Sequence, residues 1–113
     1  MNTLSLSTLR AVGSTGAPLP EEGFEWVYES LKADVRLDSA SGGTDVCTAF
    51  LLGSPWHPVR AGELQCAALG AKVASFDDTV HAVIDQVGEL VLLEPLPSMP
   101  IGFWNDDSGE RLR

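Results

Sequence analysis

The spacing of hydrophobic residues changes near the middle of the chain. From residue 20 to residue 34, apolar side chains recur every three or four positions, which predicts one amphipathic helix with the stripe Phe24, Val27, Tyr28 and Leu31. Short apolar runs flank it, Leu9 to Ser14 before and Val35 to Leu37 after, and both have the length of strands. Strand, helix and strand in this order predict a right-handed βαβ crossover with parallel strands, spanning roughly Leu9 to Ala40.

Beyond Gly53 the helical spacing disappears and prolines and glycines interrupt the chain. The clearest strands of this half are Ala71 to Phe76 and Glu89 to Leu93. We therefore expect an α/β fold in which residues 1–52 form one βαβ unit of a larger sheet and residues 53–113 form a β-rich, barrel-like part of the same domain. Two parallel strands do not bury themselves alone, so this unit is expected to be a piece of something larger.

Both strands of the predicted crossover run into loops of small residues. The first loop is Gly13 to Pro18 and the second is Ser39 to Asp45. Because parallel neighbours end at the same edge of a sheet, and ligands bind at that edge in open α/β sheets, the two loops are candidates for one binding site. Backbone N–H groups and the Thr44 hydroxyl suit a phosphate, and the Asp45 carboxylate suits Mg²⁺. From these residues alone, an ordinary turn remains the alternative.

Five segments, in order and spacing, resemble the adenylate-forming (AMP-dependent synthetase/ligase) superfamily, and in particular its acetoacetyl-CoA synthetase (acetoacetate–CoA ligase) subgroup. They are Gly13 to Pro18, Ser41 to Cys47, Pro58 to Glu63, Gly88 to Val91, and Pro97 to Pro100 with Phe103-Trp104. The resemblance implies a partial N-terminal, AMP-binding domain. It also implies nucleotide-binding roles for Gly16, Ala17, Pro18, Gly43, Thr44 and Asp45, with Asp45 as the metal ligand. Asp45 is one methylene shorter than the glutamate common in the family, so its exact contact with the metal stays open, and no catalytic residue is assigned.

The resemblance further implies an acid–thiol ligase that turns acetoacetate, ATP and CoA into acetoacetyl-CoA, AMP and pyrophosphate, with ATP/AMP, Mg²⁺ and CoA as cofactors and substrates. The family's lysine-ending phosphate loop, its ribose aspartate and its C-terminal domain are not found in this sequence. We therefore expect a truncated ligase segment that is inactive alone, binds nucleotide weakly and has the missing ligase parts as possible partners. The alternatives are a non-catalytic interaction module that keeps only the fold, and a fragment of another short-chain acyl-CoA synthetase.

Composition and charge exclude some classes of binding partner. Seven basic and sixteen acidic residues give a formal charge of −9, which disfavours nucleic acid and anionic membrane surfaces. The longest apolar stretch, Leu90 to Leu93, is too short to span a membrane, and no secretory signal is visible, so a cytoplasmic protein is expected. The two cysteines are expected to be buried and reduced, His57 and His81 to be ordinary loop residues, and Trp56 and Trp104 to be packing anchors.

Overall fold

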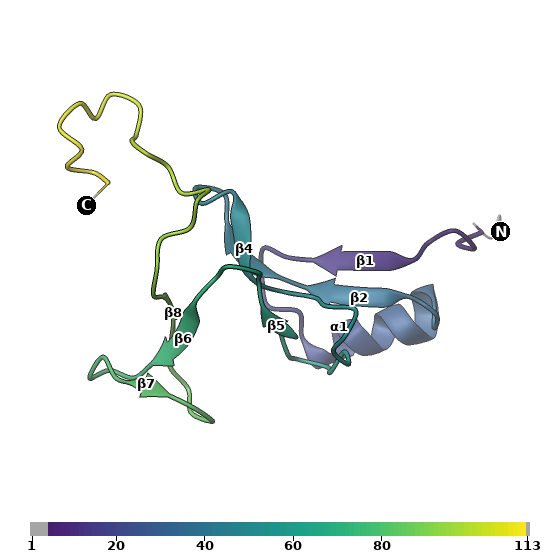
Figure 1. The fold of residues 1–113 in the computed structure, drawn as a ribbon. Coiled ribbons are helices and arrows are strands. Elements are labelled where there is room, and N and C mark those ends of the chain that lie inside the picture. The colour runs from purple at the N-terminus through teal and green to yellow at the C-terminus, as the bar shows by residue number, and fades with distance from the viewer. Residues whose placement is uncertain (1–4, 113) are drawn as a thin grey trace.

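The computed structural model describes residues 5–112. Its N-terminal part is a crossover in which β1 (Ala11–Ser14) leads through α1 (Glu21–Trp26) to β2 (Arg36–Ser39), and the two strands pair in parallel (Figure 1). Ala11 lies opposite Arg36 and Ser14 opposite Ser39, so both strands end at the same edge. The predicted βαβ unit is confirmed.

The helix ends in a wider turn. After α1 the chain continues as a π-helical segment, η1 (Val27–Leu31), and the backbone N–H of Lys32 donates to the carbonyl of Val27 at 2.9 Å. The Lys32 ammonium donates to the carbonyl of Leu9 at 2.6 Å, just before β1. This bond ties the end of the helix to the start of the first strand.

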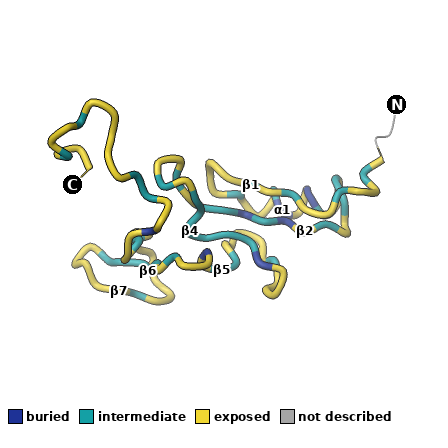
Figure 2. The backbone as a smooth tube through the Cα atoms, turned by 45° about the horizontal axis from the view of Figure 1, so that its top comes forward, coloured by how far each residue is buried: buried dark blue, intermediate teal, exposed yellow. Residues whose placement is uncertain are grey.

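The hydrophobic core lies between the helix and the parallel strands. Its buried members are Phe24, Val27 and Leu37, and Leu37 is only 1% exposed. Partly buried apolar side chains pack around them: Val12, Leu19, Tyr28, Leu31, Val35 and Val59. The predicted helical stripe is therefore the face that packs on the sheet. Most of the residues coloured as buried in Figure 2 belong to this βαβ unit.

The second half consists of two antiparallel sheets. One has the order β3 (Ser41–Gly43), β4 (Thr48–Leu52), β5 (Cys66–Ala67), and the other has the order β7 (Ala82–Val83), β6 (Val73–Phe76), β8 (Glu89–Leu92). The two strands expected from sequence correspond to β6 and β8, so the β-rich prediction is confirmed. Both sheets are open three-stranded sheets, and no closed barrel forms within residues 5–112. β4 and β5 lie on opposite sides of the predicted boundary at residue 52, and they pair with each other. The division into residues 1–52 and 53–113 stays a prediction.

The predicted loop from Ser39 to Asp45 is wrong in part, because Ser39 ends β2 and Ser41–Gly43 form β3. Gly42 makes this strand possible: a Cβ there would overlap the carbonyl oxygen of Thr48 and lie 2.6 Å from the Cα of Ala49. The irregular register between Ser41 and Gly42 lies at the same point. The turn that remains, Thr44 to Cys47, is closed by the Cys47 N–H, which donates to the Thr44 carbonyl at 3.1 Å.

The molecule is elongated. Its radius of gyration is 17.7 Å and its extents are 58 × 36 × 24 Å, whereas a compact domain of this length has a radius of gyration of about 13 Å. The C-terminal tail runs away from the sheets (Figure 1). Trp56 and Trp104 are 87% and 89% exposed, so their expected role as packing anchors is wrong for this structure. The expected burial of the cysteines is wrong as well, because Cys47 is exposed and Cys66 is only partly buried.

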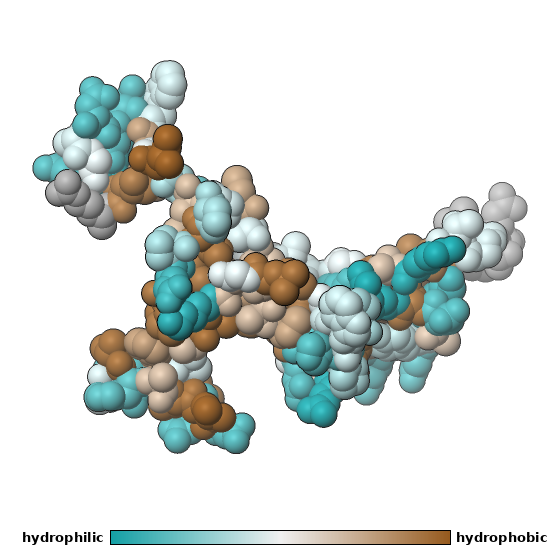
Figure 3. All heavy atoms as spheres, in the orientation of Figure 1, coloured by the Kyte–Doolittle hydropathy of each residue, from teal (hydrophilic) through white to brown (hydrophobic). Residues whose placement is uncertain are grey.

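Hydrophobic atoms lie at the surface over the β6–β8 region and near the start of the tail (Figure 3). Among residues 5–112 there is no helix whose length and apolar character would let it cross a membrane.

Candidate functional site

A cavity of about 990 Å³ lies at the carboxyl edge of the parallel strands. It is open on one side, and three segments form its walls. Residues 15–19 after β1 form the first wall, residues 39–44 and 47–49 around β3 form the second, and residues 62–64 before β5 form the third. Its size is at the upper end of the roughly 300–1,000 Å³ that ligand sites occupy.

The first wall is a glycine turn anchored to the core. Gly16 has a φ of 90°, in the left-handed region that favours glycine, and no atom lies within 4 Å of where its Cβ would be. Leu19, at the end of this wall, packs against the core. The Ala40 N–H donates to the Ser14 carbonyl at 2.9 Å, which joins the first wall to the second.

The second wall carries two of the three remaining nucleotide candidates, Gly43 and Thr44. The cavity is lined by five of the six predicted site residues: Gly16, Ala17, Pro18, Gly43 and Thr44. Asp45 is exposed in the same turn but is not among the lining residues. No cluster of three or more His, Cys, Asp or Glu side chains suited to a metal is found in the part of the chain that the structure describes.

The third wall, Gly62 to Leu64, was not expected from the sequence. Glu63 follows a turn in which its N–H donates to the Arg60 carbonyl at 3.2 Å, and Gly62 has a φ of 77°. A Cβ on Gly62 would lie 3.3 Å from Cγ of Glu21, so the turn sits against the first residue of α1. The segment Pro58 to Glu63 resembled the family, but no local pattern indicates a contact with Glu21.

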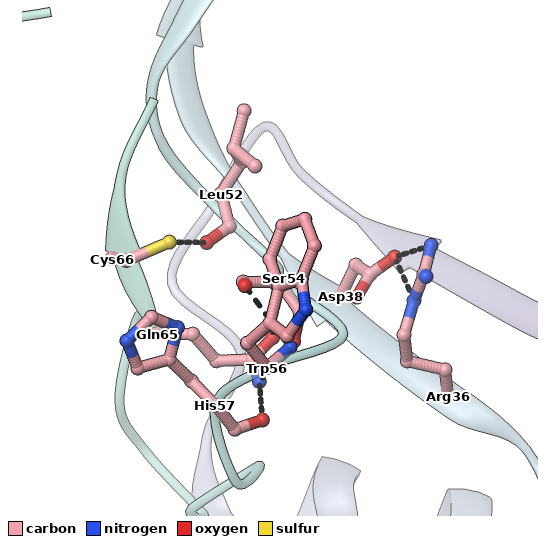
Figure 4. Close-up of polar contacts among 8 residues, drawn as sticks. All are labelled: Arg36, Asp38, Leu52, Ser54, Trp56, His57, Gln65 and Cys66. Atoms are coloured by element: carbon pink, nitrogen blue, oxygen red, sulfur yellow. Dashed lines mark hydrogen bonds and ion pairs between the residues drawn. The ribbon is translucent and has the colours of Figure 1, made fainter. Parts of the chain in front are cut away.

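Gln65 holds the loop that carries the third wall (Figure 4). Its Oε1 accepts from the Ser54 N–H at 3.1 Å, and its Nε2 donates to the carbonyls of Ser54 and His57 at 3.3 and 2.7 Å. Ser54 is buried, and its hydroxyl oxygen accepts from the Trp56 N–H at 3.2 Å. One side chain therefore fixes both ends of the excursion from β4 to β5.

Most of the lining surface is apolar, but the lining also carries several hydroxyl groups and one charged residue. Hydroxyl groups come from Thr15, Ser39, Ser41, Thr44 and Thr48, and the only charged lining residue in the described range is Glu63. Arg60 lies 3.9 Å from the Glu63 carboxylate, and both side chains are more than half exposed. The cavity thus offers hydrogen bonds to a phosphate but no lysine, arginine or histidine of its own.

Neither histidine lines this cavity. Nδ1 of His81 lies 2.9 Å from the Thr79 hydroxyl in the turn between β6 and β7. In that turn the His81 N–H and the Thr79 hydroxyl donate to Asp77, and these hydrogen bonds hold the pKa of Asp77 below its usual value.

Comparison with known proteins identifies the fold. No protein-family model matches the chain. The structure of acetoacetyl-CoA synthetase from Streptomyces lividans superimposes with a TM-score of 0.82 at 46% identity, over 95% of this chain and 17% of that one. The anthranilate CoA ligase AuaEII, solved in complex with anthranoyl-AMP, superimposes with a TM-score of 0.74 at 21% identity, over 95% of this chain and 20% of that one, which supports the fold alone. The chain therefore carries part of the fold of the adenylate-forming superfamily.

Within this superfamily the chain is similar to the acetoacetyl-CoA synthetases. It is 49% identical over 111 residues to the enzyme of Rhizobium meliloti (strain 1021) and 44% identical over 110 residues to that of Xenopus tropicalis. These alignments cover 98% and 97% of this chain but 17% and 16% of the relatives. The chain therefore spans about a sixth of the length of these relatives, and the resemblance predicted from sequence is confirmed.

Proposed function

We propose that this chain supplies part of the nucleotide site of an ATP-dependent acyl-CoA ligase that acts on acetoacetate. In the proposed reaction, a carboxylate attacks the α-phosphorus of ATP to give an acyl-adenylate and pyrophosphate, and CoA then takes the acyl group as a thioester. The observation that supports this best is the single cavity lined by both small-residue loops. A cytoplasmic location is part of the proposal.

In this proposal the first loop binds the adenine and the second loop binds a phosphate. Gly16, Ala17 and Pro18 offer a flat backbone surface for adenine, because a glycine with positive φ lets the ligand approach the main chain closely. Gly43 and Thr44 offer N–H groups and a hydroxyl to a phosphate. This assignment explains why the cavity is built from small residues.

Asp45 fits the role of a magnesium ligand only together with the nucleotide. It contributes one exposed carboxylate beside the cavity, and no cluster of further metal-ligating side chains surrounds it in residues 5–112. Mg²⁺ in nucleotide sites is commonly bound by one or two carboxylates together with phosphates and water. Asp45 would hold the ion together with the nucleotide, and the ion would supply positive charge at the phosphates.

We further propose that the chain alone does not catalyse adenylation. A developing charge at the α-phosphorus must be stabilised by positive groups, and the lining contains none. Catalysis by this segment then needs cationic groups from other parts of a ligase. Another short-chain acid in place of acetoacetate is the alternative substrate.

An interaction module is the second candidate function, and the elongated shape favours it. Trp56 and Trp104 are exposed, and the radius of gyration exceeds that of a compact domain. In this case the chain associates with other polypeptides and binds no nucleotide. The discriminating observation is whether ATP reaches the cavity.

Titration of the ¹⁵N-labelled chain with ATP–Mg²⁺ tests the proposal. We expect amide shifts at Gly16, Ala17 and Gly43 to Asp45, with a dissociation constant of about 1 mM or weaker, because only about 4 kcal/mol of binding free energy is available without a cation for the phosphates. Thr44→Val should reduce the shifts in the second loop, and Thr8→Val, an exposed threonine before β1, should leave them unchanged. Shifts centred on His57 or His81, or micromolar binding, would contradict the site assignment.

Activity is tested separately. With ATP, Mg²⁺, acetoacetate and CoA, the purified chain should release no pyrophosphate above background. Pyrophosphate release that depends on acetoacetate and copurifies with the chain would show that the described groups suffice for the reaction.

A further inference from the structure

The third wall contains the one charged residue among those that line the cavity in the described part of the chain. Glu63 belongs to the turn before β5, and every other lining residue is apolar or carries a neutral polar group. The nucleotide assignment uses the first and second walls and gives no role to Glu63. The wall it belongs to is therefore available for the other substrate.

The position of Glu63 is set by its surroundings. Gly62 rests against the side chain of Glu21, and the turn is closed by the hydrogen bond from the Glu63 N–H to the Arg60 carbonyl. Gln65 holds the same loop at Ser54 and His57. Glu63 thus lies at the edge of the cavity in a turn that is held on both sides.

The Glu63 charge has one ion-pair partner, and that pair is open to solvent. The guanidinium of Arg60 is 3.9 Å from the Glu63 carboxylate, and the two side chains are 69% and 60% exposed. Ion pairs this open to solvent are weak. Beside Glu63, Leu64 and Ala49 add apolar surface to the same cavity.

We propose that Glu63 selects the acid substrate by charge. It disfavours acids that carry a second anionic group and accepts acids whose far end is neutral, with Leu64 and Ala49 giving that end apolar contact. The proposal rests on the proposed function, since it assumes that an acid binds in this cavity beside the nucleotide. For two like charges about 4 Å apart in solvent, the expected discrimination is about fivefold in dissociation constant.

Two four-carbon acids that differ in charge test the proposal on the full chain. Acetoacetate carries one carboxylate and succinate carries two at neutral pH. Titrated into the ¹⁵N-labelled chain with ATP–Mg²⁺ present, acetoacetate should shift the amides of Ala49 and Gly62 to Leu64, and succinate should bind about fivefold more weakly. Raising the salt from about 0.1 M to about 1 M should reduce this ratio, because the Debye length falls from about 10 Å to about 3 Å.

Glu63→Gln and Glu94→Gln form a matched pair of variants. Both glutamates are about equally exposed, at 60% and 62%, and each has one basic partner, Arg60 for Glu63 and Lys72 for Glu94. Both substitutions change the net charge by the same amount, but Glu94 is outside the cavity lining. Glu63→Gln should bring the succinate and acetoacetate constants to within about twofold, and Glu94→Gln should keep the fivefold ratio.

The proposal is overturned if the ratio of the succinate and acetoacetate dissociation constants is the same in Glu63→Gln and Glu94→Gln. It is also overturned if the amides of the third wall show no saturable shift up to about 50 mM acid, a concentration at which even very weak sites fill. Loss of ATP shifts at Gly16 and Gly43 with the acid selectivity retained contradicts the proposed nucleotide function instead. The two failures are therefore distinguishable in one set of spectra.

Discussion

Gly42 and Gly43 are neighbours in β3 with different surroundings. A Cβ on Gly42 would overlap the Thr48 carbonyl oxygen in β4, whereas a Cβ on Gly43 would lie 3.5 Å from Cγ2 of Val46, an ordinary contact. Gly42→Ala should therefore force β3 away from β4 and cost about 1–3 kcal/mol, as overpacking does. Gly43→Ala is the control and should change the stability of this hairpin by less than about 1 kcal/mol. Urea titrations followed at the Thr48 and Ala49 amides would measure both, and equal effects would contradict the close approach.

Asp77 organises the turn between β6 and β7. Its Oδ1 accepts hydrogen bonds from the His81 N–H at 2.9 Å and from the N–H and hydroxyl of Thr79 at 2.9 and 2.7 Å. These bonds favour the carboxylate and lower the pKa of Asp77 below the usual 3.8. The stabilisation is therefore fully present above the usual value and is lost as the pH falls through the lowered pKa.

We expect the amide shifts of Thr79 and His81 to change between about pH 5 and pH 2 with a midpoint below the usual aspartate value. Asp77→Asn keeps an acceptor oxygen but cannot ionise, so this transition should disappear. Asp78→Asn changes the adjacent carboxylate and should leave it in place. A midpoint above 3.8 would contradict the hydrogen-bonded turn.

At the scale of elements, Leu37 joins β2 to the helix. It is 1% exposed and lies in the core with Phe24 and Val27. Leu37→Ala should cost about 2–5 kcal/mol, a large share of the roughly 5–15 kcal/mol that stabilises a typical domain. The midpoint of urea unfolding, followed at the Val12 and Leu37 amides, should fall sharply. Leu69→Ala is the matched control because Leu69 is fully exposed, and a comparable fall in that variant would contradict the core assignment.

The elements that sequence could predict are those with a local signal. The helical stripe and the apolar runs of β1, β6 and β8 depend on near neighbours, so they could be found without a structure. β3 was missed because Gly42-Gly43 is typical of a loop, and its pairing with β4 depends on a close approach that spacing does not encode. In the cavity, the glycine loops follow from βαβ geometry, whereas Glu63 lies there in a turn that rests against Glu21 and is held by Gln65, contacts between residues far apart in sequence that spacing does not encode.

Many large hydrophobic side chains of the molecule are exposed, including Trp56, Leu69, Ile101 and Trp104. Exposed aromatic side chains such as Trp56 and Trp104 favour weak self-association. Small-angle scattering at low concentration should give a radius of gyration near 17.7 Å, and the value should rise with concentration. Trp104→Ser should reduce that rise, and Thr8→Ser should not. A concentration-independent value near 13 Å would show a compact domain instead.

The three sheets share no strand pairing with one another in residues 5–112, and the one buried hydrophobic cluster lies at the β1–β2 sheet. The three sheets are therefore not expected to unfold together in one cooperative transition on heating. The β6–β7–β8 sheet, which has no buried cluster of its own, will loosen before the parallel pair does. A calorimetric scan of this chain will then be broad, with a van't Hoff enthalpy below the calorimetric one, and one melting temperature will not describe it.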